Sequence, residues 1–233
     1  MIDSRPALEA RLTEVRGRIE SACERARRDP EGVRLVAAAK GVKAELVRWA
    51  VEAGIRDIGE NYVKEMTATI ESVGAGEATW HYVGALQSST AHRVADLADV
   101  VHSLVPGRGA ERLAGRAERD GRRITSLLQV DFTGERQGVA PEGAPEAAEE
   151  LRNLPGLELR GLMTLPPMTD RAEDARPCFR RLRELRDGMA ERVGELRELS
   201  MGMSGDFEVA VEEGATMIRI GTALFGERPL TRV

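Results

Sequence analysis

The feature that most limits the fold of this chain is a regular alternation of short apolar runs with longer amphipathic ones. A helix is expected first, over residues 7–28, and eight strand-like runs follow it, each succeeded by a helix-like run. The expected strands span residues 33–39, 55–59, 80–84, 100–104, 123–131, 157–163, 196–201 and 216–220. Because a helix separates each strand from the next, the strands should pair in parallel.

Eight strand–helix units are the number found in a (β/α)8 TIM-type barrel. The expected helices after the strands span 44–53, 61–73, 88–97, 108–119, 145–152, 171–193 and 206–213, with a last turn over 221–225. A doubly wound open sheet is the alternative α/β fold, but the units are regular and no G-x-G-x-x-G motif follows the first strand. With no linker or repeat in the chain, residues 1–233 are expected to form a single barrel domain with an extra N-terminal helix.

The composition is that of a soluble protein with no nucleic-acid or membrane partner. Hydrophobic residues make up 42% of the chain and charged residues 31%, with a net charge of −5, whereas phosphate backbones favour a basic face. No apolar run approaches the roughly 18 residues of a membrane span. Cys23 and Cys178 lack metal-ligand spacing, so we expect no metal site and a reduced, cytoplasmic protein.

The run over residues 35–40 ends on a lysine in a chain that otherwise uses arginine. Of the 34 basic residues, only Lys40, Lys43 and Lys64 are lysines. A desolvated ammonium can lose its proton and attack a carbonyl, which a guanidinium cannot do. Lys40 closes the first expected strand, and the carboxyl ends of barrel strands form the active face, so it is the first candidate for chemistry. The alternative is a lysine whose amine simply reaches solvent from the strand end.

Two turns rich in glycine and hydroxyl residues follow the last two expected strands, where TIM barrels often bind phosphate. Residues 200–206 read Ser-Met-Gly-Met-Ser-Gly-Asp, and residues 219–226 read Arg-Ile-Gly-Thr-Ala-Leu-Phe-Gly. Such turns direct backbone N–H groups and hydroxyls at an anion, although glycine and serine also serve as ordinary helix caps. A lysine facing a phosphate cup predicts either a sugar-phosphate aldolase or a pyridoxal 5′-phosphate (PLP) site.

Arg219 helps to choose between these two sites. It lies within the last expected strand, so its side chain and those of Ile218 and Ile220 point to opposite sides. A buried arginine needs an acceptor, and the pyridine nitrogen of PLP can be one. A salt bridge to a neighbouring carboxylate is the alternative, and a lysine-dependent aldolase without cofactor leaves Arg219 without a role.

Six segments of the chain, in order, resemble the YggS/PROSC family of PLP homeostasis proteins. They are residues 35–40, 58–62, 81–87, 161–163, 199–204 and 218–226. The segments Leu-Ser-Met-Gly-Met-Ser and Arg-Ile-Gly-Thr-Ala-Leu-Phe-Gly are highly specific to that family. The family is similar to the barrel domain of alanine racemase and lacks that enzyme's second, β-rich domain. The resemblance implies a PLP-binding protein of intracellular PLP and amino acid homeostasis, without established catalytic turnover.

Carried over position by position, the resemblance assigns Lys40 as the lysine that forms the internal aldimine with PLP. It assigns Arg219 as the arginine that faces the pyridine nitrogen. The remaining cofactor-binding candidates are the phosphate positions Ser204, Gly221 and Thr222, the nearby Ser200 and Met203, the lining residues Asn61 and His81, and the wall residue Met163. No residue is assigned as catalytic. PLP is the implied partner, free amino acids and PLP-dependent apoenzymes are further candidates, and a monomer is expected.

A PLP-dependent racemase acting on free amino acids is the second hypothesis. A carboxylate on the pyridine nitrogen keeps that nitrogen protonated and deepens the electron sink, whereas Arg219 would favour the unprotonated ring and limit this chemistry. A racemase also needs a second acid/base on the opposite face of the substrate, and Tyr62 and Tyr82 are both expected to be structural. His92 and His102 are expected to be single histidines without ligand partners.

Overall fold

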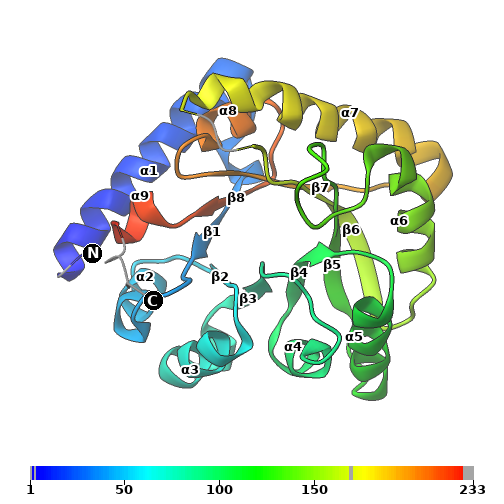
Figure 1. The fold of residues 1–233 in the computed structure, drawn as a ribbon. Helices are drawn as coiled ribbons and strands as arrows, with labels where there is room; N and C mark the ends of the chain where they lie inside the picture. The colour runs from blue at the N-terminus through cyan, green and yellow to red at the C-terminus, as the bar shows by residue number, and fades with distance from the viewer. Residues whose placement is uncertain (1, 3, 168–169, 228–233) are drawn as a thin grey trace.

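The computed structural model describes residue 2 and residues 4–167 and 170–227. Eight parallel strands close into a barrel in the order β1 to β8, and helices surround it (Figure 1). The strands are β1 (Arg34–Ala38), β2 (Asp57–Glu60), β3 (Thr79–Tyr82), β4 (Val100–Leu104), β5 (Ile124–Gln129), β6 (Leu157–Met163), β7 (Glu198–Met203) and β8 (Met217–Ile220). The predicted (β/α)8 barrel is confirmed.

The helices follow the strands as the sequence pattern predicts. They are α1 (Arg5–Ala26), α2 (Ala44–Glu52), α3 (Val63–Val73), α4 (Ala91–Leu97), α5 (Arg108–Arg119), α6 (Ala144–Arg152), α7 (Arg176–Val193), α8 (Phe207–Glu212) and α9 (Thr222–Phe225). The extra helix α1 precedes the barrel and packs against α2, α8 and α9. Its buried side chains recur at three- and four-residue steps, as in any helix with one apolar face.

Several element boundaries differ from those predicted. The second strand begins at Asp57 and ends at Glu60, and the seventh begins at Glu198 and ends at Met203. Helix α7 begins at Arg176, since Pro177 has no N–H group and occupies the first helical turn. The helix predicted from residue 88 begins at Ala91.

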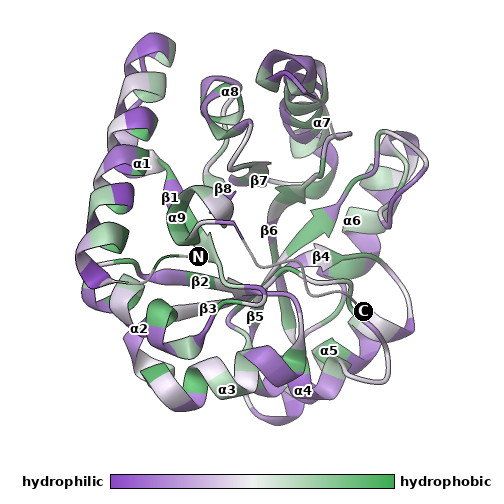
Figure 2. Ribbon diagram, turned by 60° about the vertical axis from the view of Figure 1, so that its left-hand side comes forward, coloured by the Kyte–Doolittle hydropathy of each residue, from purple (hydrophilic) through white to green (hydrophobic). Residues whose placement is uncertain are grey.

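The apolar core has two parts. The larger part lies between the strands and the surrounding helices, whose apolar faces turn toward the barrel (Figure 2). The smaller part fills the barrel interior and consists of Val36, Leu127, Met163 and Met217, from β1, β5, β6 and β8. The interior also holds polar side chains from β2, β3, β4, β7 and β8, which are described below.

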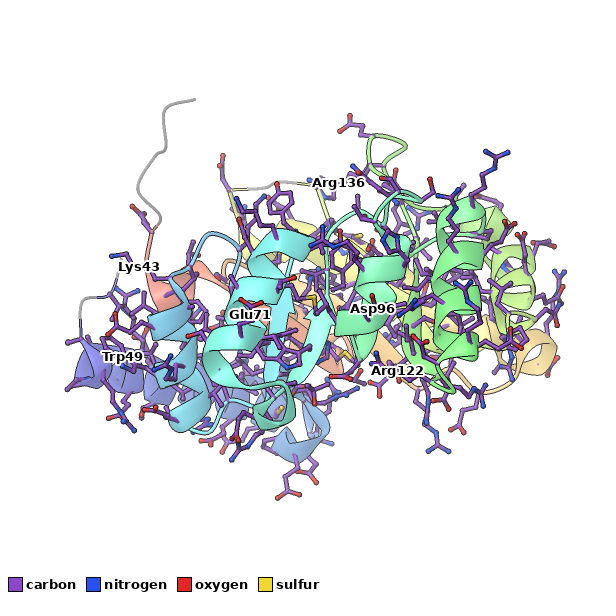
Figure 3. All side chains as sticks on the ribbon, turned by 90° about the horizontal axis from the view of Figure 1, so that it is seen from below. Lys43, Trp49, Glu71, Asp96, Arg122 and Arg136 are labelled. Atoms are coloured by element: carbon purple, nitrogen blue, oxygen red, sulfur yellow. The ribbon has the colours of Figure 1, made fainter. Side chains whose placement is uncertain are left out.

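All strands run in the same direction, so the barrel has two different ends. Lys43 follows β1 and Arg136 follows β5, and both lie toward one end, whereas Arg122, which precedes β5, lies toward the other (Figure 3). The end with Lys43 collects the turns after the strands, which we call the mouth of the barrel. Within the described part of the chain, no helix has the length and apolarity needed to cross a membrane.

Candidate functional site

Lys40 lies at the mouth, two residues beyond the end of β1. The backbone N–H of Ala39 still donates to the carbonyl of Gly59 on β2, at 2.8 Å, so the strand geometry continues almost to the lysine. Val36 belongs to the barrel interior, and alternation along β1 directs Lys40 to the same side. The Lys40 side chain is half-buried, and its amine lies 5.2 Å from the centroid of the Tyr62 ring.

The turns after β7 and β8 meet at Ser204. Its hydroxyl accepts hydrogen bonds from the backbone N–H groups of Gly221 and Ala223, both at 3.2 Å. Thr222 starts α9, where an N–H group has no acceptor within its own helix. A cavity of about 620 Å³ opens here, lined by Ser204, Thr222 and Arg11, among others. Hydroxyl groups, the N–H group of Thr222 and an arginine are suited to an anion.

The turn after β7 depends on Gly202. This residue has φ +92°, and a Cβ on it would come within 2.5 Å of the Ala210 Cβ. The next residue, Met203, donates its N–H to Asp206 Oδ1 at 2.6 Å. The Met-Gly-Met-Ser motif is thus explained by a tight turn that packs α8 against β7 and presents Ser204 at the mouth.

Arg219 is 5% exposed, and its guanidinium is held by two neutral acceptors. One N–H donates to Ser200 Oγ at 2.6 Å, and another donates to the carbonyl of Thr164, just beyond β6, at 3.0 Å. No ion pair joins Arg219 to a carboxylate among the described residues, so the salt bridge considered as the alternative is not found. Burial lowers the pKa of Arg219 to about 10, with the charge of Asp206 opposing the effect.

The three remaining candidates, Met163, Asn61 and His81, lie in different parts of the barrel. Met163 is buried in the interior cluster. Asn61 follows β2 and lines a cavity of about 400 Å³ with Tyr62 and Tyr82, among others. Its backbone is packed so closely against Gly84 that a Cβ there would lie 2.0 Å from the Asn61 carbonyl oxygen. This close approach explains the glycine in the segment after β3.

His81 is fully buried in the barrel and contacts the mouth only through other residues. Its Nε2 lies 2.8 Å from Asp57 Oδ1, and its Nδ1 lies 2.8 Å from His102 Nε2. His102 Nδ1 in turn lies 2.8 Å from Ser200 Oγ, the acceptor of Arg219. His102 thus has two hydrogen-bond partners inside the barrel, which is a structural role.

The partners of His102 were not evident from the sequence because two of them come from distant segments. His81 and His102 are on consecutive strands, and β4 pairs with β3 through His81 and Val100. Two histidines on the interior side of adjacent parallel strands are a signal that could have suggested a pair. Asp57, Thr164 and Arg11 carry no such local signal.

The structure thus brings most of the candidates to one side of the barrel. Lys40, Arg219, Gly221, Thr222, Ser200, Met203 and Ser204 come from β1, β8 and β7 or the turns after them, and these strands are neighbours. Met163 comes from β6, which adjoins β7. One rim of the mouth combines a primary amine, a donor-rich turn for an anion and a buried cation whose acceptors are neutral.

Comparisons with known proteins assign the chain to a family. The family model for the alanine racemase N-terminal domain matches residues 11–229. A pyridoxal phosphate homeostasis protein of Aquifex aeolicus is 41% identical over 94% of this chain and 97% of its own length. The protein of that name from Pseudomonas aeruginosa is 40% identical over 93% and 94%. The chain belongs to the family of pyridoxal phosphate homeostasis proteins.

Solved structures agree with this membership of the family. PipY of Synechococcus elongatus PCC7942, solved with PLP bound, is similar to this chain with a TM-score of 0.84 and 34% identity, over 94% of this chain and all of PipY (100%). Alanine racemase of Clostridium difficile 630 has a TM-score of 0.72 at 15% identity, and the match covers 96% of this chain but 56% of the racemase. The second likeness shows that the two proteins share the barrel fold.

Proposed function

We propose that this chain is a PLP-binding protein of intracellular PLP and amino acid homeostasis that holds PLP at the barrel mouth through Lys40. The observation that carries the proposal is the convergence of Lys40, Ser204 and Arg219 from three neighbouring strands. The names of the curated relatives and the PLP bound to PipY support it.

The residues present fit PLP at each of its polar groups. The hydroxyl of Ser204 and the backbone N–H of Thr222 offer donors for a phosphate, and Gly221 holds Ser204 in place through its own N–H. The Arg219 guanidinium is held by Ser200 and Thr164 on two N–H groups, and a guanidinium has five. The rest are available for the acceptor nitrogen of a pyridine ring.

The cofactor supplies an aldehyde that condenses with a primary amine and releases water. Lys40 is the amine that meets it in this proposal, and the Tyr62 ring, 5.2 Å from the amine, helps to position it. Asn61 and Met163 border the space on the β2 and β6 sides. Ser200 and Met203 support the site from β7, and His81 acts on it indirectly.

The chemistry at the ring favours storage over turnover. Arg219 only donates hydrogen bonds, so it leaves the ring nitrogen without a proton and the electron sink shallow. The hydroxyl of Tyr82 donates to the carbonyl of Ala85 at 3.3 Å, and Tyr62 contacts Lys40 through its ring. These contacts do not favour the racemase hypothesis. We infer that free amino acids and PLP-dependent apoenzymes take PLP from Lys40, whose imine bond an incoming amine can replace.

The proposed setting is a cytoplasmic monomer. Gel filtration of the PLP-loaded protein at several concentrations tests this, and a stable dimer whose dissociation releases PLP contradicts it.

The test of PLP binding is the visible absorption spectrum of the protein mixed with PLP. We expect a yellow protein, complete loss of the covalent signal in Lys40→Arg, which keeps the charge but cannot condense, and retention of the signal in Lys64→Arg. A wild-type protein that stays colourless with PLP contradicts the proposal. Chiral analysis of alanine and serine after incubation tests the racemase hypothesis, since turnover at enzyme-like rates would overturn the storage role.

A further inference from the structure

A continuous series of hydrogen bonds crosses the barrel interior and ends at Arg219. It begins at Asp57 on β2 and passes through His81 on β3, His102 on β4 and Ser200 on β7, with heavy-atom distances of 2.8 Å at each of these three contacts. The final contact, from Arg219 on β8 to Ser200 Oγ, is 2.6 Å. Both imidazoles are fully buried. We call these five residues the interior chain.

The two ends of the interior chain fix the direction of every bond in it. A guanidinium can only donate, and an ionised carboxylate can only accept. Ser200 therefore accepts from Arg219 and donates its hydroxyl proton to His102 Nδ1. His102 then donates from Nε2 to His81 Nδ1, and His81 donates from Nε2 to Asp57. In this arrangement both imidazoles are neutral and carry their proton on Nε2.

In any other protonation state, one hydrogen-bonding group of the interior chain lacks a partner. A proton added to either ring supplies a second donor between His102 and Ser200, and the Ser200 hydroxyl proton then has no acceptor in the chain. Burial lowers the pKa of His102 well below its usual range, and the positive charges of Arg219 and Arg34 act in the same direction. The neutral, unidirectional arrangement is the one in which every member of the chain is paired.

The far end of the interior chain reaches solvent at the end of the barrel opposite the mouth. The Asp57 side chain is 14% exposed and borders a cavity of about 350 Å³ between α1 and the beginnings of β1 and β2. The other charged groups on this cavity are Arg16 and Glu20 of α1, Glu31 of the turn before β1, and Arg56. The interior chain thus runs from a partly exposed carboxylate at one end of the barrel to Arg219 near the other.

We propose that Asp57, His81, His102 and Ser200 are positioning residues that orient Arg219 toward the cofactor ring and transmit the charge of Asp57 to it across the barrel. The inference rests on the proposed function, because it assigns Arg219 to the ring. A carboxylate bonded directly to Arg219 would occupy two of its N–H groups. The interior chain supplies negative charge at a distance and occupies one, which leaves donors for the ring.

The first test reads the imidazoles in the protein without PLP. The chain has three histidines, and His92 is exposed on α4, so nitrogen chemical shifts of the rings can be assigned with His92 as internal reference. We expect His81 and His102 to be neutral Nε2–H tautomers across neutral pH. A cationic ring or an Nδ1–H tautomer at either position overturns the assigned direction.

The second test removes the charge at the far end with Asp57→Asn, whose side-chain carbonyl can still accept from His81. The readout is the pH profile of the visible absorption band of the PLP-loaded protein. Loss of the negative charge of Asp57 makes it harder to protonate the bound cofactor. We therefore expect the midpoint of the absorption change to move to lower pH by roughly one unit. The matched control is Asp120→Asn, which removes an exposed carboxylate before β5 at the same end of the barrel and should leave the profile unchanged.

The outcomes separate this inference from the proposed function. An unchanged profile in Asp57→Asn, at equal PLP occupancy, shows a structural role only and overturns the transmission of charge. An equal shift in Asp120→Asn overturns it as well, because a general field would then explain the effect. A protein that takes up no PLP overturns the proposed function and the coupling with it, while the imidazole tautomers still decide the direction of the chain.

Discussion

Two regions of this molecule bury charged side chains in opposite ways. Between α7 and α8, the buried carboxylate of Glu213 pairs with Arg176, Arg180 and Arg183 at 3.1, 3.2 and 3.0 Å. In the barrel wall and mouth, Glu60 and Arg219 are equally buried but have only neutral hydrogen-bond partners. The arginines between α7 and α8 neutralise the charge of Glu213 directly. Glu60 and Arg219 have no direct ion pair among the described residues.

The pKa directions record this difference. Burial alone would raise the pKa of Glu213, but the hydrogen bonds and charges of its arginines outweigh burial, and the pKa lies below its ordinary value. Burial raises the pKa of Glu60 to about 7, with the Thr69 hydroxyl opposing and the charge of Glu65 adding to the effect. Removing one member of a buried ion pair is costly to a fold, and unpaired burial is tolerated where a charge or proton has another use.

The largest expected effect is in the paired region, from Glu213→Gln. This change leaves three arginines around an uncharged group, and we expect the free energy of unfolding to fall by about 3 kcal/mol at neutral pH. Because the folded-state pKa is lowered, the Glu213 contribution is full above the ordinary value of 4.5 and is lost as pH falls through the folded-state pKa. Denaturant unfolding at neutral and acid pH measures both effects.

The control for this prediction is Glu149→Gln, which weakens an exposed pair with Arg192. It should leave unfolding unchanged within error, because exposed ion pairs contribute little. PLP uptake should be normal in both variants. A destabilisation by Glu149→Gln equal to that of Glu213→Gln would show that burial is not what makes the Glu213 cluster strong.

The next effect is smaller and opposite in sign, from Glu60→Gln on β2. Glu60 Oε2 is buried without a hydrogen-bond partner in the described structure, so the ionised form is costly. The folded state binds the extra proton between the ordinary pKa of 4.5 and about 7, and stability therefore falls as pH rises through that window. We expect Glu60→Gln to raise the free energy of unfolding by about 2 kcal/mol above this window and to remove the slope within it.

Unfolding curves of wild type and Glu60→Gln across this pH window check the sign. A slope that persists in the variant would assign it to another group. A loss of stability in Glu60→Gln at high pH would show that the Glu60 carboxylate has a cationic partner after all, and the contrast with Glu213 would then disappear.

The fold was predictable because its information is local. Each strand–helix unit carries its own apolar period and ends on its own glycine or polar turn, and the predicted bounds of β4, α5 and β6 agree with the structure. The turns after β7 and β8 were also predictable, since Gly202 and the residues around Ser204 specify their own geometry. Closure of the barrel then brings these turns beside β1.

The contacts inside the barrel were not predictable in the same way. His102 and Ser200 are 98 residues apart in sequence and meet only because the barrel is closed. Asp57 lay within an expected strand and gave no sign that its side chain points inward. Thr164 contributes a backbone carbonyl, which any residue could supply. Local patterns determine which elements form, and the side-chain partners depend on how all eight strands curve together.

Among these variants, Arg219→Met is expected to change the stability of the fold least and the affinity for PLP most. The change leaves Ser200 and the Thr164 carbonyl without this donor but also relieves the burial of an unpaired charge, so it should lower the stability of the protein without PLP by no more than about 1 kcal/mol. A lost hydrogen bond from a charged donor costs about 1.5 kcal/mol, which corresponds to a roughly tenfold weaker affinity for PLP. Thermal unfolding without PLP measures the effect on stability, and spectral titration with PLP measures the effect on affinity.

The matched change in the other region is Arg180→Met, which removes one half-exposed partner of Glu213. It should reverse the pattern, with slightly lower stability and unchanged PLP affinity, because Arg180 serves the fold alone. If Arg219→Met instead unfolds the protein and Arg180→Met does not, the guanidinium in the barrel is itself a structural ion. In both regions the buried charge would then stabilise the fold, and only the partners of the charge would differ.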